Sequence, residues 1–185
     1  MLKTKAEISP MFFAVLTLFL LADRNGTAFP AVMFSFAHEA GHFLALSATK
    51  TAPKKVSISL AGISMELSQS MSTKEKIAVL CAGFTVNFCL AVLFFALGKT
   101  LFAIINFVIG IFTFLPLAST DGGSIVKEVL EARYPEKAKK AENMLFMCSC
   151  VFLSLLIVAA MAATKNFYLL IALFYLVICT IKAKS

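Results

Sequence analysis

Long apolar runs constrain the fold of this chain more than any other feature. Apart from Glu39 and Asp121, charged residues are missing from six stretches: 8–22, 25–49, 77–98, 100–126, 143–164 and 166–181. Of 185 residues, 60% are hydrophobic and 15% are charged, whereas water-soluble domains carry about 25% charged residues. A transmembrane helix needs about 20 apolar residues. The sequence therefore predicts an all-α polytopic membrane protein with six transmembrane helices, built as one integral-membrane domain over residues 1–185.

The distribution of basic residues predicts how these helices are oriented. Of the 17 Lys and Arg residues, all except Arg24, Lys99 and Lys165 lie before the first run, after the last run, or in the loops that follow the second and fourth runs. The positive-inside rule then places both termini and these two loops in the cytoplasm. The net charge of +7 is spread in short clusters between apolar runs. This pattern indicates a lipid bilayer as the partner and argues against nucleic acid.

Two stretches in the cytoplasmic loops have a periodicity of their own. Residues 56–67 alternate apolar and polar side chains on each side of Gly62, which is typical of a β-hairpin. We expect this small hairpin in the loop between transmembrane helices 2 and 3. Residues 123–132 have apolar positions interleaved with charges and are followed by Pro135. They predict a short interfacial helix that ends before the proline.

The second apolar run contains a metal-binding pattern. The only two histidines of the chain, His38 and His42, are four residues apart, and Glu39 follows the first. On a helix this spacing puts both imidazoles on one face, where they can bind one zinc ion, while the glutamate activates a water. Ionisable groups inside a membrane span are costly unless they are paired or bound to a metal. The alternative interpretation is a hydrogen-bonded polar cluster between helices.

A third zinc ligand must come from elsewhere in the chain. A catalytic zinc usually has three protein ligands and an open position for water, and there is no third histidine. The only carboxylate within or at the end of another span is Asp121, which precedes Gly122 and Gly123. The missing ligand must then be Asp, Glu or Cys, and Asp121 is the carboxylate candidate. A simpler interpretation is that it is the N-cap of the following helix.

Three motifs together resemble the site-2 protease family of intramembrane zinc metalloproteases. They are His38-Glu39-Ala40-Gly41-His42, the stretch Gly83-Phe84-Thr85-Val86-Asn87, and the stretch that runs from Phe112 to Gly123. The resemblance implies that Asp121 is the third ligand of one zinc ion, and that Asn87 belongs to a GxxxN motif. Small six-span members without a PDZ domain, like those that process a sporulation sigma-factor precursor, are nearest in size. A prokaryotic cell membrane is the location that the resemblance implies.

The resemblance implies a metalloendopeptidase that cleaves in or near the transmembrane segment of a membrane-bound regulatory protein. Glu39 is the expected base, and Asn87 is a candidate for contacting the substrate or stabilising the oxyanion. The hairpin, at Ile58 and Met65, would offer an edge strand to a single-span substrate, or merely cover the cytoplasmic mouth of the site. A regulatory membrane partner is possible but unidentified. The rival interpretation is a zinc sensor or transporter without proteolysis, for which a base beside the metal would be unnecessary.

Overall fold

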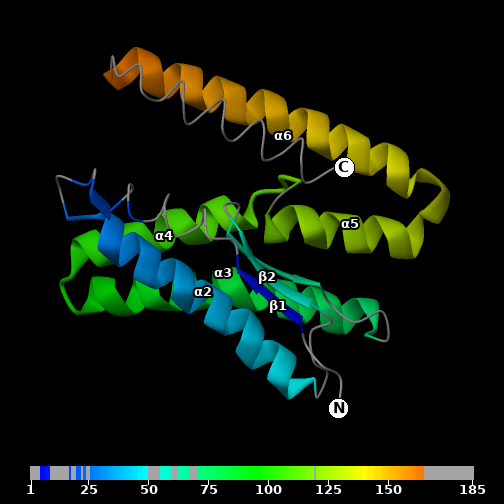
Figure 1. Ribbon diagram of the computed structural model, residues 1–185, viewed down its shortest axis with the longest axis horizontal. Coiled ribbons are helices and arrows are strands. Elements are labelled where there is room, and N and C mark those ends of the chain that lie inside the picture. The colour runs from blue at the N-terminus through cyan, green and yellow to red at the C-terminus, as the bar shows by residue number, and fades with distance from the viewer. Residues whose placement is uncertain are drawn as a thin grey trace. The chain divides into compact units, whose positions relative to one another are not determined.

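The computed structural model describes residues 5–8, 17, 20, 21, 23, 26–49, 55–59, 62–66, 71–118 and 120–164. The chain divides into two compact units, Met1–Leu115 and Pro116–Ser185, which are described separately below. The described residues are mostly helical (Figure 1). This confirms the helical part of the predicted fold class. The predicted spans 8–22 and 166–181 lie largely or wholly outside the described residues, so the number of six spans stays a prediction.

The first unit contains a small sheet of three strands. Strand β2 (Lys55–Ser59) lies between β1 (Lys5–Ile8), which is parallel to it, and β3 (Gly62–Glu66), which is antiparallel. The parallel pairing with β1 had no counterpart in the sequence analysis. Because Ile58 is in the central strand, its backbone is paired on both sides, while Met65 is in an edge strand. The strand edge expected at both residues is therefore available at Met65 only.

The described residues of the first unit also form three long helices. Helix α2 spans Ala28–Ala48, α3 spans Thr73–Ala96, and α4 spans Thr100–Phe114. Helix α3 begins with a capping box, in which Ser72 and Glu75 satisfy each other's backbone N–H groups. Helices α3 and α4 are joined by three residues, and Gly98 in this connection has a φ of +70°, which glycine adopts without strain. The connection between these two helices is therefore short.

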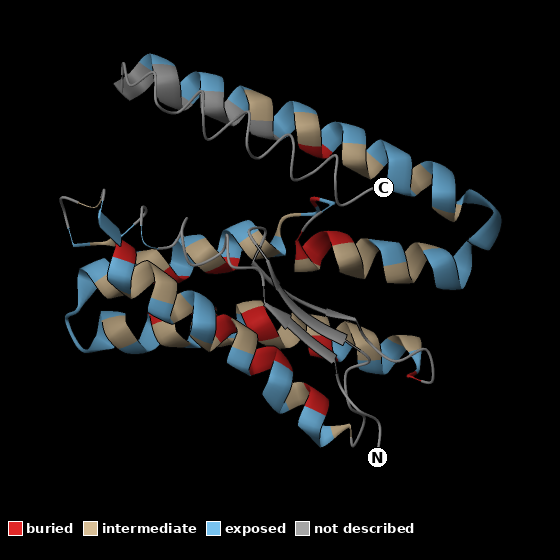
Figure 2. Ribbon diagram, viewed as in Figure 1, coloured by how far each residue is buried: buried red, intermediate tan, exposed pale blue. Residues whose placement is uncertain are grey.

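Helices α2 and α3 face each other through rows of residues that repeat every four positions. The buried row on α3 consists of Val79, Gly83, Asn87 and Ala91, and the buried residues of α2 include His38, His42 and Leu46 (Figure 2). A Cβ atom on Gly41 of α2 would come within 2.9 Å of the backbone oxygen of Ala82. The two backbones therefore approach closely because this position is a glycine.

The fourth apolar run, 100–126, is interrupted at Pro116. Helix α4 ends at Phe114, since Pro116 lacks a backbone N–H and its ring would collide with the preceding turn. In the second unit, α5 (Asp121–Arg133) covers the predicted short helix, and α6 (Pro135–Thr164) follows it. The Lys127 ammonium donates a hydrogen bond to Glu142 at 2.8 Å, which joins α5 to α6 and raises the pKa of the lysine.

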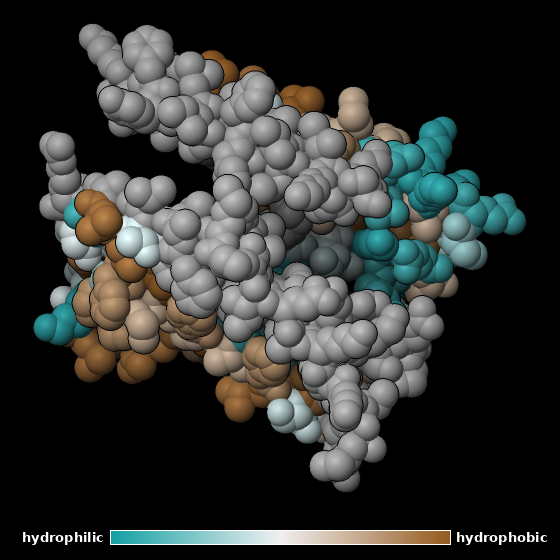
Figure 3. Space-filling model, viewed as in Figure 1, coloured by the Kyte–Doolittle hydropathy of each residue, from teal (hydrophilic) through white to brown (hydrophobic). Residues whose placement is uncertain are grey.

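The surfaces of these helices are unusually apolar. Large apolar side chains such as Leu44, Val92 and Phe95 are more than 70% exposed, and Figure 3 shows hydrophobic groups gathered over α2, α3 and α4. Among the described residues, helix Thr73–Ala96 is long and apolar enough to cross a membrane, and the apolar α4 has 15 residues. Exposed apolar surface on this scale requires lipid or a large partner to cover it.

Candidate metal centre

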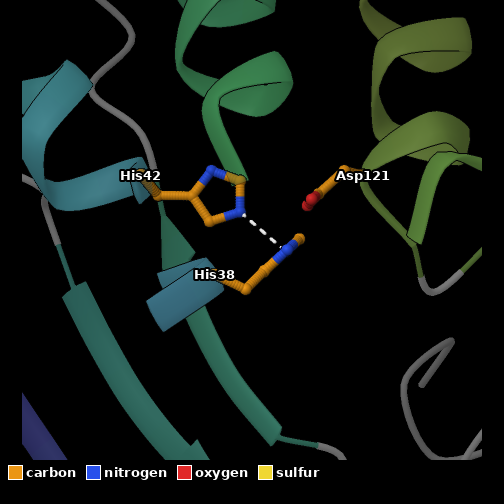
Figure 4. A group of neighbouring side chains, drawn as sticks. All are labelled: His38, His42 and Asp121. Atoms are coloured by element: carbon orange, nitrogen blue, oxygen red, sulfur yellow. Dashed lines mark hydrogen bonds between the residues drawn. The ribbon is translucent and has the colours of Figure 1, made fainter. Parts of the chain in front are cut away.

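The two histidines of α2 lie side by side in the interior of the first unit. Each is 5% exposed. Their spacing of four residues puts both imidazoles on one face of the helix, and their Nε2 atoms are 3.2 Å apart (Figure 4). The structure therefore brings His38 and His42 together as the sequence predicts.

Hydrogen bonds to the other ring nitrogens determine where each imidazole carries its proton. His42 Nδ1 lies 2.8 Å from the backbone oxygen of Val79, which can only accept, so this nitrogen must donate. His38 Nδ1 lies 2.7 Å from Oδ1 of Asn87, which also accepts. In the neutral rings both Nε2 atoms are then unprotonated, and their lone pairs face each other. Such an arrangement requires a cation or a proton between the two nitrogens.

The separation of the two nitrogens fits a zinc ion. Nitrogen ligands bound at about 2.0–2.1 Å with a tetrahedral angle between them lie about 3.3 Å apart. The observed Nε2 to Nε2 distance is 3.2 Å. Metal-bound histidines usually donate their second ring N–H to a carbonyl or carboxylate, which orients the ring. His38 and His42 both have an acceptor in this position, so both residues fit a zinc site.

Gly83 leaves the space that the two imidazoles occupy. A Cβ atom at this position of α3 would collide with His42 Nε2 and would lie 2.6 Å from His38 Nε2. Real Cβ atoms essentially never come within 3.0 Å of another heavy atom. Glycine is therefore required here because both candidate ligand atoms point at the backbone of α3.

Asn87 is fully buried one turn further along α3. Its Oδ1 accepts from His38, and its Nδ2 donates to the backbone oxygen of Phe34 at 3.3 Å and to Asn106 Oδ1 at 3.1 Å. These bonds use both amide hydrogens. The hydrogen bond to His38 lets Asn87 orient that imidazole, and the substrate or oxyanion contact that the resemblance implies for Asn87 stays a prediction.

Glu39 is on α2 next to His38 and is half-buried. Ala48 is the last residue of α2. Glu39 lies nine positions before it, which corresponds to roughly 13 Å of helix at 1.5 Å per residue.

Asp121 is the first residue of α5, in the second unit. The N-cap of this helix is Thr120, whose hydroxyl accepts from the Gly123 N–H. The simpler interpretation of Asp121 as the N-cap is therefore wrong. A Cβ on Gly123 would collide with the backbone oxygen of Leu117, so this glycine lets the preceding turn fold tightly onto the helix.

Comparison with known proteins identifies the fold. No protein-family model matches the sequence, and no curated protein matches it. A search of solved structures matches the chain to the site-2 protease from Methanocaldococcus jannaschii, with a TM-score of 0.70 and 14% sequence identity. The match covers 98% of this chain and 91% of the other. The chain has the site-2 protease fold.

The site-2 protease fold confirms the resemblance that the sequence motifs suggest. Two features of the site were nevertheless missed by sequence reasoning, namely Asn106 and the backbone oxygen of Val79 that accepts from His42. Asn106 could have been found, because a lone amide inside an apolar run is costly unless it has hydrogen-bond partners. A backbone carbonyl leaves no signal in the sequence.

Proposed function

We propose that this chain is an intramembrane zinc metalloprotease. It hydrolyses a peptide bond in or near the transmembrane segment of a membrane-bound regulatory protein, and its site opens to the cytoplasmic side. The observation that carries this proposal is the pair of Nε2 atoms 3.2 Å apart, on rings that are both committed to donating from Nδ1. The glutamate between these histidines in sequence is the second element that hydrolysis needs.

One zinc ion is the proposed cofactor, held by His38, His42 and Asp121. Each of these three side chains carries one ligand atom of a type that zinc binds. Two imidazoles and a carboxylate are the kind of donor set found in catalytic zinc sites, which leave a fourth position for water. Since Thr120 already caps α5, the role of Asp121 is not explained by helix capping.

The zinc ion, when bound, supplies Lewis-acid activation of water and of the scissile carbonyl. Glu39 accepts a proton from the water as the water oxygen attacks the carbonyl carbon. The same carboxyl group then gives this proton to the amide nitrogen as the carbon–nitrogen bond breaks. His38 and His42 each keep their Nδ1 proton in a hydrogen bond, which leaves Nε2 of each ring for the metal.

The substrate is proposed to be a single-span protein that unwinds near the cytoplasmic face. Peptide bonds inside a membrane helix are hydrogen-bonded internally, so the substrate must become extended before it is cut. The edge strand β3, which includes Met65, is the proposed pairing partner. We further propose that the protein is multi-pass in a prokaryotic membrane with both termini in the cytoplasm, where its 14 clustered basic residues would lie.

The proposal is tested by co-expressing the chain with candidate single-span transcription-factor precursors or anti-sigma proteins. We expect a cleavage product that Glu39→Gln removes, with a loss of at least about 10²–10⁴-fold in rate because the amide cannot accept the proton. Zinc content should not change. The matched control is Ser47→Ala, which removes an exposed hydroxyl on the same helix that bonds only to the backbone oxygen of Phe43.

The outcome also separates proteolysis from the rival function. Near wild-type cleavage in Glu39→Gln would show that the base is assigned wrongly. Zinc binding without cleavage of any candidate, in the wild-type chain and in Glu39→Gln alike, would favour a sensor or transporter. Absence of zinc from the purified wild-type chain would contradict both functions.

A further inference from the structure

A continuous series of side-chain hydrogen bonds joins helices α2, α3 and α4. His38 on α2 bonds to Asn87 on α3, and Asn87 bonds to Asn106 on α4 at 3.1 Å. The series ends where Asn106 Nδ2 donates to the backbone oxygen of Phe102 at 2.9 Å. Both asparagines are 0% exposed. Burying two amides costs free energy unless their groups are paired, and the described hydrogen bonds pair them.

The bond at the Asn106 end determines which group donates and which accepts in each hydrogen bond of this series. The Phe102 oxygen can only accept, so Asn106 must turn its NH₂ group toward it and its Oδ1 toward Asn87. Asn87 then faces two acceptors, Asn106 Oδ1 and the Phe34 oxygen, and must turn its own NH₂ group toward them. Its Oδ1 is left for His38. If Asn87 were flipped, its Oδ1 acceptor would face these two acceptors, and no hydrogen bond could form with either of them.

The orientation of the Asn87 amide matters because the neutral imidazole of His38 has two tautomers. If Asn87 could flip, its NH₂ group would face His38 Nδ1, and the ring proton would move to Nε2. From there it could be donated to His42 Nε2, which is 3.2 Å away. This proton would occupy the position between the two nitrogens where the metal must bind. His42 has no such choice, since its Nδ1 bonds to a backbone oxygen that cannot turn.

We propose that Asn106 is a positioning residue that keeps the metal-binding nitrogen of His38 unprotonated. Asn106 acts through Asn87 and touches neither the metal nor the substrate. The proposal rests on the proposed zinc site, because it concerns how that site is prepared for the ion. It assigns a role in the metal centre to α4, the helix that supplies no ligand to it.

Zinc affinity provides the first test. Removing a residue that orients a metal ligand typically lowers metal affinity about 10–100-fold. For Asn106→Leu we expect a loss near the lower end, about tenfold, because the Phe34 oxygen still favours the correct orientation of Asn87. The matched control is Thr85→Val, which removes an α3 hydroxyl that bonds only within its own helix. Equal zinc affinity of Asn106→Leu and the wild-type chain would overturn the proposal.

A second variant distinguishes positioning from a general effect on folding. A carboxylate at position 87 accepts from His38 whichever way it turns, so Asn87→Asp should no longer depend on Asn106. We expect Asn106→Leu to lower zinc affinity in the wild-type background and to have little effect in the Asn87→Asp background. A similar loss in both backgrounds would show that Asn106 only supports the fold.

The tautomer of His38 can be read without any metal. In the zinc-free protein above about pH 8, where histidine is neutral, the ¹⁵N shifts of its ring report which nitrogen carries the proton. We expect the Nδ1–H form in the wild-type chain and an increased Nε2–H form in Asn106→Leu. Unchanged shifts would refute the inference even if zinc binding or proteolysis failed for other reasons, so the two failures remain distinguishable.

Discussion

Replacing Gly83 by alanine tests the metal centre more directly than replacing a ligand. The added methyl carbon would collide with His42 Nε2 and would lie 2.6 Å from His38 Nε2. Non-bonded heavy atoms prefer separations of about 3.5–4.0 Å, so the imidazoles must retreat by about 1 Å. Metal–ligand distances tolerate changes of only about 0.2 Å. We therefore expect Gly83→Ala to lower zinc affinity by at least about 100-fold, which is the upper end of the effect of losing an orienting partner.

The same substitution should not unfold α3 through its backbone preference. Alanine is favoured over glycine in a helix interior by about 1 kcal/mol, which opposes part of the cost of overpacking, about 1–3 kcal/mol. The assay measures zinc affinity by competition with a chromogenic chelator, alongside thermal unfolding of the zinc-free protein in detergent. Loss of zinc with little change in unfolding temperature is the expected result.

Gly110→Ala on α4 is the matched control for this experiment. The three atoms nearest to its methyl group would belong to the ring of Phe88, the first at 3.0 Å, and that side chain can move. We expect the control to keep its zinc. If Gly83→Ala bound zinc as tightly as the wild-type chain, the imidazoles could not both point at α3, and the geometry of the site would be refuted.

Three further predictions follow from the proposed function and topology. Asp121→Asn should give a folded protein with sharply lowered zinc occupancy and no cleavage, because the helix N-cap is the preceding residue and only the ligand changes; normal zinc and activity would place the third ligand elsewhere. Reporter fusions at Lys99 and Lys139 should lie on opposite sides of the membrane, and labelling on the same side would reject the six-span topology. Met65→Pro in the edge strand should reduce cleavage more than zinc content. Ile58→Pro in the central strand should reduce both cleavage and zinc content, since it replaces a residue whose strand is paired on two sides. Equal effects of the two variants would argue against strand pairing with the substrate.

Local sequence patterns were enough to predict most of the helices and the histidine pair. The spacing of His38 and His42 needs only the pitch of a helix, and Pro116 ends α4 by its own chemistry. Other features depend on how helices pack, which periodicity does not determine. The bond between Asn87 and Asn106 joins residues of two helices, and the parallel pairing of β1 with β2 joins segments about 50 residues apart.

The N-cap of α5 shows a different limit of sequence reasoning. Both Thr120 and Asp121 are suitable N-cap residues by type, so the sequence permits either. The choice depends on where the chain turns after Pro116. In the second unit this turn is held by the hydroxyl of Ser149 on α6, which accepts from the Ala118 N–H at 2.9 Å. A contact between residues 31 positions apart therefore helps to hold the turn that precedes the N-cap.

The proposed zinc site requires one particular pairing of α2 with α3, because three residues of α3 lie against the two imidazoles: Val79, Gly83 and Asn87. The oxygen of Val79 orients one imidazole, Asn87 orients the other, and Gly83 gives both of them room. Sliding α3 by one turn, 5.4 Å, would put valine or asparagine opposite the rings, and either side chain would fill the space of the ion. Apolar helices in a bilayer have little else to distinguish one register from the next. We therefore expect zinc to be retained only by correctly paired helices, so that metal occupancy would report whether α2 and α3 have assembled in the correct register.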